Sequence, residues 1–318
     1  MSLSEFELIN KYFKNAFNNS TDVKCGIGDD AAIVSLPAGM ELAISVDTLV
    51  AGIHFPLAAS PEDIGYKSLA VNLSDMAAMG AEPQWIMLSL TMPENNEAWL
   101  QSFMSGFGVL AKQYSLSLMG GDLTHGPLSV TVQTHGYVPA GQALYRHGTE
   151  IGDLIYVSGT LGDAGLALRM LDNKQDVEEK YRDYLIQRLN RPVPKIELGI
   201  VLRGIANSVI DISDGLLADL NHILVASHKG AEVFLDKLPV SEAISQLPDE
   251  LAIDIALSSG DDYELCFTVP PERKSIVEKK LSSFPLSFIG QVMEGTGIKW
   301  LRNDGSEFLP SGNAYRHF

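Results

Sequence analysis

Aspartates stand at the edges of apolar segments along the whole chain. They lie in CGIGDDAAIV (25–34), ISVDTLV (44–50), NLSDMAAMGA (72–81), LMGGDLT (118–124) and IDISDGL (210–216). A carboxylate beside apolar sequence is costly to remove from water unless a cation or hydrogen bonds compensate it. We therefore expect several of these aspartates to form a functional site.

Two of these aspartates oppose the local structural preference. Asp75 lies inside a helical pattern and Asp47 inside a strand pattern, and aspartate is disfavoured in both. This conflict favours a functional role for the two residues. Asp214, in contrast, fits the role of N-cap for a helix expected to begin near Leu216.

Hard oxygen ligands in this number indicate magnesium, which binds one or two carboxylates together with waters and phosphate oxygens. Several such ions would neutralise the phosphates of a nucleotide. Calcium is disfavoured because no D-x-D-x-D-G-x5-E loop is present, and zinc because cysteine and histidine do not cluster.

Glycines next to the aspartates support a phosphate ligand, since they let backbone approach it closely. The runs are 26–28, 120–121 and 158–162, and the last one precedes an expected helix whose N-terminus would hold an anion. Neither the P-loop sequence nor the glycine-rich loop of protein kinases occurs.

Composition narrows the partners. The chain has 318 residues and a formal net charge of −17, which disfavours nucleic acid and anionic membrane surfaces. Its two cysteines, Cys25 and Cys266, are far apart and are interpreted as reduced thiols. We find no signal-peptide pattern and no apolar run of about 20 residues, so a cytoplasmic location is expected.

Strands alternate with helices, which predicts an α/β (α+β) architecture. Length favours two domains, divided within the glycine-rich segment 139–152, so we expect domains at 1–145 and 146–318. The expected strands are 31–36, 41–50, 85–92, 128–138, 153–158, 209–212, 231–235, 263–269 and 288–293. The expected helices are an N-terminal amphipathic segment, 61–80, 95–113, 163–171, 176–190, 195–206, 215–228 and 271–282.

Seven sequence blocks together resemble the thiamine-monophosphate kinases, which belong to the aminoimidazole ribonucleotide synthetase-like superfamily. The blocks are GIGDDAA (26–32), SVDTLVAGIHF (45–55), KSLAVNLSDMAAMGA (67–81), MGGDLT (119–124), ISDGL (212–216), SGDDYEL (259–265) and AYRHF (314–318). The resemblance implies a magnesium-dependent transferase that phosphorylates thiamine monophosphate to thiamine diphosphate with ATP. It also implies a two-domain fold and a homodimer in which N-terminal sheets of two chains pair. Because magnesium ions would bring the two anionic phosphates together, we expect direct in-line transfer.

The resemblance also implies roles for individual residues. The implied metal ligands are Asp30, Ser45, Asp47, Asp75, Asp122, Asp211 and Asp214, of which Asp47, Asp75 and Asp122 are the expected catalytic positions. The implied ATP-binding residues are Gly121, Asp122, Arg146 and Ser213. The implied substrate-binding residues are His54, Asp261, Asp262 and Tyr315.

The chain departs from the family pattern at three places. Val46 stands where a threonine is common, Asp261 replaces a glutamate, and Ala314 replaces a glycine before the terminal aromatic. Two other functions are compatible with these residues. One is a different ATP-activating synthetase of the superfamily, and the other is a nucleotide-binding module without catalysis.

Overall fold

The computed structural model describes residues 3–14, 16–17 and 20–310, which form two compact units. The N-terminal unit comprises the chain up to Met76 and Ala81–Gly141. The C-terminal unit comprises Ala77–Gly80 and the chain from Gln142 onward. Each unit has its own sheet and its own core, as expected for a two-domain protein of this length.

Within the described part of the N-terminal unit, four strands form a mixed sheet in the order β3–β6–β4–β5. The β3–β6 and β4–β6 pairs are antiparallel, and β4–β5 is parallel. The strands are β3 (Met40–Val50), β4 (Glu82–Met92), β5 (Ser117–His125) and β6 (Ser129–Pro139). The other elements are α1 (Glu5–Leu8), a π-helix (Ile9–Phe13), β1 (Val23–Cys25), β2 (Ile33–Val34), α2 (Pro61–Ala78) and α3 (Glu97–Gln113).

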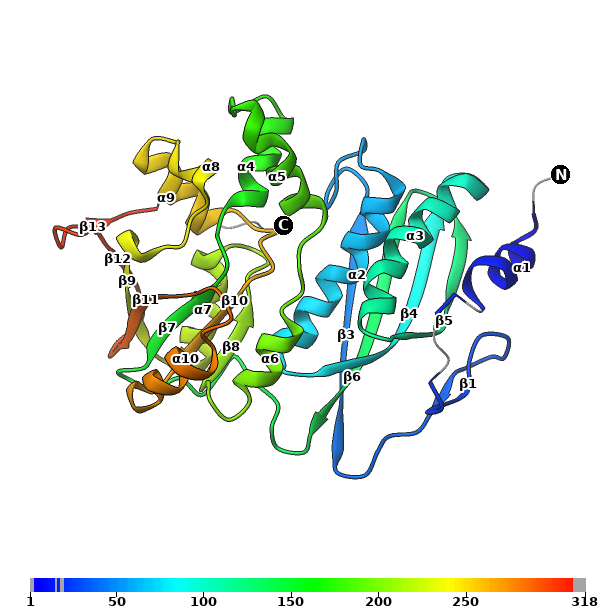
Figure 1. The fold of residues 1–318 in the computed structure, drawn as a ribbon, viewed down its shortest axis with the longest axis horizontal. Helices are drawn as coiled ribbons and strands as arrows, with labels where there is room; N and C mark the ends of the chain where they lie inside the picture. Colours follow the sequence, from blue (N-terminus) through cyan, green and yellow to red (C-terminus); the bar gives the residue numbers. More distant parts are fainter. Residues whose placement is uncertain (1–2, 15, 18–19, 311–318) are drawn as a thin grey trace. The chain divides into compact units, whose positions relative to one another are not determined.

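Helices α2 and α3 lie across one face of this sheet (Figure 1). Helix α2 is buried on nearly all sides and includes the fully buried Lys67 and Asn72. Helix α3 begins after Asn96, whose side chain accepts the backbone N–H of Trp99 at 3.0 Å. Both helices therefore form a packed layer that brings the side chains of α2 against strand β3.

Within the described residues, the C-terminal unit holds a seven-stranded sheet in the order β13–β12–β9–β11–β7–β10–β8. Only β12 and β9 pair in parallel among these neighbours. The strands are β7 (Leu154–Ser158), β8 (Ser208–Asp211), β9 (Gly230–Phe234), β10 (Leu265–Val269), β11 (Leu286–Met293), β12 (Gly297–Leu301) and β13 (Glu307–Phe308).

The helices of the C-terminal unit surround two apolar clusters, one beneath the sheet and one between α4, α5, α8 and α9. The α-helices are α4 (Asp163–Leu171), α5 (Glu179–Asn190), α6 (Ile196–Leu202), α7 (Leu216–Ser227), α8 (Glu242–Ser245), α9 (Asp249–Ser258) and α10 (Lys274–Lys280). Short 3-10 turns occupy Leu235–Lys237 and Pro271–Arg273.

The observed architecture confirms the mixed α/β prediction and most of its long elements. The strand expected at 31–36 is reduced to two residues in β2, which pairs only with β1. Strands β1, β5, β12 and β13 and helices α8 and α9 were not predicted. No helix of the described residues is long and apolar enough to cross a membrane.

Candidate active site

Ser45, Asp47 and Asp75 meet where strand β3 packs on helix α2. The Ser45 hydroxyl donates a hydrogen bond to the Asp75 carboxylate, and Asp75 also interacts directly with the Asp47 carboxyl group. The side-chain oxygen of Asn72 accepts the backbone N–H of Asp47 at 3.1 Å. Two carboxyl groups are thus held against each other in a half-buried place.

This proximity has an electrostatic consequence. Burial, followed by repulsion from Asp75, raises the pKa of Asp47 from its ordinary value of 3.8 to about 6. Two neighbouring carboxylates cannot both ionise cheaply unless a cation joins them. The pair therefore favours either a shared proton or a bound metal ion.

A second group of predicted residues lines a cavity of about 500 Å³ in the N-terminal unit. Its lining includes Asp30, Gly121 and Asp122 together with the apolar residues Phe6 and Phe13. Such a lining suits a ligand with a flat apolar part and a charged part.

The glycine pair in this wall has a structural explanation. Gly121 lies in β5 with φ of 152°, and a Cβ there would stand 1.8 Å from the carbonyl oxygen of Leu88 on β4. The close approach that requires glycine at this position is therefore made by a neighbouring strand. The adjacent Asp122 accepts the Thr124 hydroxyl at 2.8 Å and is exposed.

His54 follows β3 in a short turn. Its Nδ1 accepts the backbone N–H of Val50 at 3.0 Å, and Lys67 donates to its carbonyl oxygen at 3.2 Å. An imidazole that accepts at Nδ1 carries its proton on Nε2 when neutral. His54 thus offers an N–H donor without needing a positive charge.

Ser213, Asp214 and Asp261 come together in the C-terminal unit. The backbone N–H of Asp261 donates to the carbonyl oxygen of Ser213 at 2.9 Å, which ties the segment 259–264 to the loop after β8. Asp211 ends β8, where it is buried and pairs with Leu265 of β10.

The prediction that Asp214 caps helix α7 is wrong. The N-cap is Gly215, and no side chain caps that end. Instead Asp219, in the first turn of α7, accepts the backbone N–H of Asp214 at 3.0 Å. The Asp219 side chain is therefore hydrogen-bonded to the backbone of the loop between β8 and α7.

Asp219 is a residue that sequence reasoning missed. Burial raises its pKa to about 7, Asp214 contributes repulsion, and backbone N–H groups and Arg146 act in the opposite direction. Arg146 therefore lies near the same loop as Ser213 and Asp214. The available signal was an aspartate in an otherwise apolar helical stretch, LLADL.

Asp262 faces the interior. Both of its carboxylate oxygens accept the backbone N–H of Gly162, at 3.1 and 2.8 Å, and the residue is 2% exposed. The backbone N–H of Gly162, at the N-terminus of α4, is therefore occupied by a side chain of the chain itself. Burial raises the pKa of Asp262 well above its ordinary value. Tyr315 lies outside the described residues.

Among the described residues, no three acidic, histidine or cysteine side chains converge as a preformed metal centre. Magnesium does not require such a cage, since it is usually bound by one or two carboxylates and completes its shell with water and substrate phosphates. The Asp47–Asp75 pair, with its mutual repulsion, fits that demand.

Comparison with known proteins identifies the relatives. Residues 28–138 match the family model of the AIR synthase related protein N-terminal domain, and residues 150–300 match that of its C-terminal domain. A thiamine-monophosphate kinase of Escherichia coli (strain K12) is 47% identical over 323 residues, covering 100% of this chain and 99% of the relative. The chain belongs to the thiamine-monophosphate kinase family.

Solved structures of thiamine-monophosphate kinases agree. The enzyme from Stenotrophomonas maltophilia K279a is 44% identical, covers 97% of this chain and 99% of its own, and has a TM-score of 0.87. A structure described as AaThiL complexed with AMPPCP and TMP is 31% identical, covers 89% of both chains, and has a TM-score of 0.78. The fold of this thiamine-monophosphate kinase family member therefore matches its relatives across both units.

Proposed function

We propose that the protein transfers a phosphoryl group from ATP to thiamine monophosphate, which yields thiamine diphosphate and ADP. The match to thiamine-monophosphate kinases over the entire chain carries this proposal. The related structure that holds AMPPCP and TMP supports the choice of donor and acceptor. The paired carboxylates of Asp47 and Asp75 supply suitable chemistry.

The reaction brings two anions together. The phosphate of the acceptor is already ionised at neutral pH, so its oxygen attacks without a strong general base. The residues of the chain must hold both phosphates in line and relieve their repulsion. Magnesium, when bound, supplies the positive charge that offsets this repulsion.

In the N-terminal unit, we assign Ser45, Asp47 and Asp75 to magnesium. Their contacts already gather two carboxyl groups and one hydroxyl at one point. We assign the cavity beside Asp30 and Asp122 to ATP, where Gly121 lies in the wall and the carboxylates would hold further magnesium.

His54 is proposed to donate its Nε2–H to the phosphate of thiamine monophosphate. The hydrogen bond from Val50 to Nδ1 supports this donor role.

In the C-terminal unit, Ser213 and Arg146 are proposed to bind ATP, and Asp211 and Asp214 to bind magnesium. Asp261 is proposed to contact the substrate, because it is partly exposed whereas the adjacent Asp262 is buried. Tyr315 lies outside the residues that the structure describes, and its contact with the substrate stays a proposal.

Mass detection of thiamine diphosphate tests the function directly. The purified protein is incubated with thiamine monophosphate, ATP and magnesium, and thiamine diphosphate and ADP are expected in equal amounts. ATP consumption that requires an aminoimidazole precursor instead would favour a different synthetase. Stoichiometric binding of both ligands without any transfer would favour a binding module.

We also propose a homodimer formed through the face of β3 that points away from α2. Along β3 the side chains alternate: Ser45 and Asp47 point to α2, whereas Ile44 and Val46 are 54% and 55% exposed on the other face. Leu42 continues this apolar row and is 38% exposed. An exposed apolar row on a sheet marks a surface that another chain covers.

Ile44→Lys should convert a dimer to a monomer, because a buried lysine would be unpaired at the centre of the interface. Light scattering coupled to gel filtration measures the mass. Val225→Lys is the matched control, since Val225 is 63% exposed on the other unit. A wild-type monomer, or a dimeric Ile44→Lys variant, contradicts the proposed interface.

We further propose that residues 1–145 act as the metal-binding, ATP-binding and dimerisation domain and that 146–318 form the second domain.

A cytoplasmic location is proposed because the substrate ATP is available there. Both cysteines are free thiols, which agrees with a reducing compartment. Fluorescence of a tagged protein in intact cells checks the location.

A further inference from the structure

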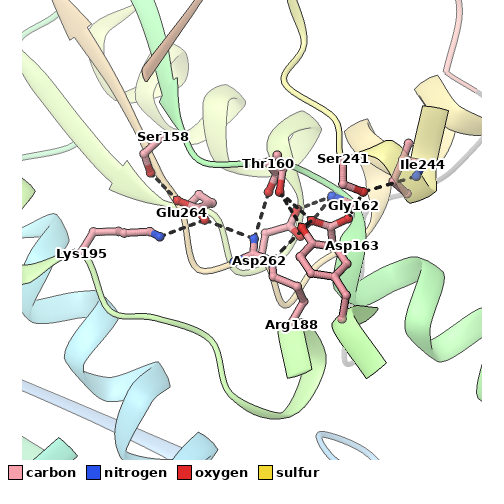
Figure 2. Close-up of polar contacts among 11 residues, drawn as sticks. Ser158, Thr160, Gly162, Asp163, Arg188, Lys195, Ser241, Ile244, Asp262 and Glu264 are labelled. Carbon is pink, nitrogen blue, oxygen red and sulfur yellow. Dashed lines mark hydrogen bonds and ion pairs between the residues drawn. The ribbon is translucent and has the colours of Figure 1, made fainter. Parts of the chain in front are cut away.

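The C-terminal unit contains a cluster of charged side chains to which the proposed reaction assigns no task. Figure 2 shows Asp163, Asp262 and Glu264 gathered around Arg188, with Lys195 on the far side of Glu264. The three carboxylates are at most 2% exposed, and the side chains of Arg188 and Lys195 are 16% and 19% exposed. Charges are placed so deeply only where neighbours compensate them.

Arg188 joins three parts of this cluster. Its NH2 group donates to Glu264 at 3.2 Å and to the carbonyl oxygen of Thr160 at 3.1 Å. Its Nε lies 3.4 Å from a carboxylate oxygen of Asp163. A planar guanidinium can face several acceptors at once, whereas an ammonium acts as a point charge.

Glu264 contacts several groups from other parts of the unit in addition to Arg188. It accepts the Ser158 hydroxyl at 2.5 Å and lies 3.0 Å from the Lys195 ammonium group. Gly159 makes room for it, because a Cβ at that position would stand 2.2 Å from the Glu264 carboxylate. Together with the bond between Asp262 and Gly162, this places two buried anchors in the segment 259–265.

The anchored segment carries strained backbone. Asp261 and Tyr263 have φ of 69° and 51°, a left-handed conformation that is unfavourable for residues other than glycine. They alternate with the anchors, so each strained residue is next to a buried carboxylate. Strain of this kind persists only where surrounding contacts determine it.

The same segment is bonded to the loop after β8. The backbone N–H of Tyr263 donates to the carbonyl oxygen of Ile212 at 2.8 Å. The backbone N–H of Ile212 donates in turn to the carbonyl oxygen of Glu264, also at 2.8 Å. Asp261 in turn donates to Ser213. A shift of Glu264 would therefore move the backbone next to Ser213, which is assigned to ATP, and next to Asp261, which is assigned to the substrate.

We propose that Arg188 is a positioning residue for phosphoryl transfer, which acts through Glu264 to hold Asp261 and Ser213 in their active conformation. This inference rests on the proposed function, because the positioned residues are those assigned there to ATP and to thiamine monophosphate. Lys195 supplies a second charge to Glu264, but Arg188 lies against both Glu264 and Asp163, so the lysine does not replace the guanidinium.

Steady-state kinetics of Arg188→Gln and Arg188→Lys test the proposal. We expect Arg188→Gln to raise the KM for thiamine monophosphate and for ATP by about tenfold, with a smaller loss of kcat. Arg188→Lys should recover part of that loss, since it restores the positive charge but not the planar guanidinium that faces several acceptors at once. Arg182→Gln is the matched control, because Arg182 lies on the same helix and pairs only loosely with the exposed Glu179.

Hydrogen–deuterium exchange of the ligand-free protein gives a readout that does not depend on activity. Arg188→Gln should exchange faster in peptides covering 211–216 and 259–265, while peptides of α3 exchange as in the wild type. The more conservative Arg188→Lys is measured in the same way, so that the comparison holds if the glutamine variant does not fold.

Unchanged KM values together with unchanged exchange in both segments would overturn the inference. Loss of folded protein in both variants, with normal KM in the fraction that remains, would also overturn it, because it indicates a purely structural role. Absence of thiamine diphosphate from the wild-type reaction would instead refute the proposed function, and exchange would still decide whether Arg188 orders the two segments.

Discussion

Asp47→Asn should stabilise the metal-free protein at alkaline pH while it removes activity. In the folded chain, burial and the neighbouring Asp75 raise the pKa of Asp47 from 3.8 to about 6. Because the folded pKa is the higher one, the folded state binds the extra proton. The stabilisation that this bound proton gives the folded state is complete below about pH 4 and is lost as the pH rises through about 6.

The magnitude follows from the two pKa values. At about 1.36 kcal/mol per pH unit, the ionised carboxylate lowers the free energy of unfolding by at most about 3 kcal/mol at pH 8. Partial exposure to water reduces this, so we expect a gain of about 1 to 2 kcal/mol for Asp47→Asn. At pH 4 the two proteins should differ by much less, because Asp47 is then protonated.

Urea denaturation in EDTA at pH 8 and pH 4 measures the effect, and the difference between variant and wild type at the two pH values isolates Asp47 from other titrating groups. Added magnesium should stabilise the wild type more than the variant. Asp63→Asn, at a partly exposed aspartate in the first turn of α2, serves as the control. A variant that is less stable than the wild type at pH 8, or equal gains at both pH values, would refute the reasoning.

Two further substitutions test other parts of the description. Asp219→Ala removes the acceptor for the Asp214 N–H and should raise the KM for ATP about tenfold, whereas Asp219→Asn keeps an oxygen and should stay within a few fold in the same steady-state assay. Gly121→Ala should cost about 3 kcal/mol or more in urea denaturation, because its methyl group meets the Leu88 carbonyl. Gly39→Ala should cost only about 1 kcal/mol, since that glycine also has positive φ but open space around it. Equal costs at the two glycines, or an unchanged KM in Asp219→Ala, would contradict these accounts.

The sequence predicted best where the signal is local. Alternation along 41–50 and helical spacing from Pro61 onward placed Asp47 in a strand and Asp75 in a helix, as the structure confirms. Strand β5 was not predicted, because its central Met119-Gly120-Gly121 resembles a loop by composition. Its fit depends on the neighbouring strand β4, which sequence spacing does not reveal.

The internal partners of the C-terminal carboxylates could not be predicted. Asp262 is bonded to an amide 100 residues away, and Glu264 to a hydroxyl 106 residues away. A buried carboxylate and an exposed one have the same letter, and only the fold distinguishes Asp262 from Asp261. The glycines at 159 and 162 predicted the close approach of a phosphate ligand, whereas the groups that lie against them in the structure are the side chains of Glu264 and Asp262.

Strand β3 bears the carboxylate face and the exposed apolar face on alternate residues, with Leu49 buried near its end. Side chains in a strand exchange faces when the register moves by one residue. A single insertion or deletion between Met40 and Ile44 that shifts the rest of the strand by one residue would therefore turn Ile44 and Val46 toward helix α2 and turn Asp47 outward. In evolution this segment should accept substitutions far more readily than any change of length, and alignments of relatives should show no gap within it.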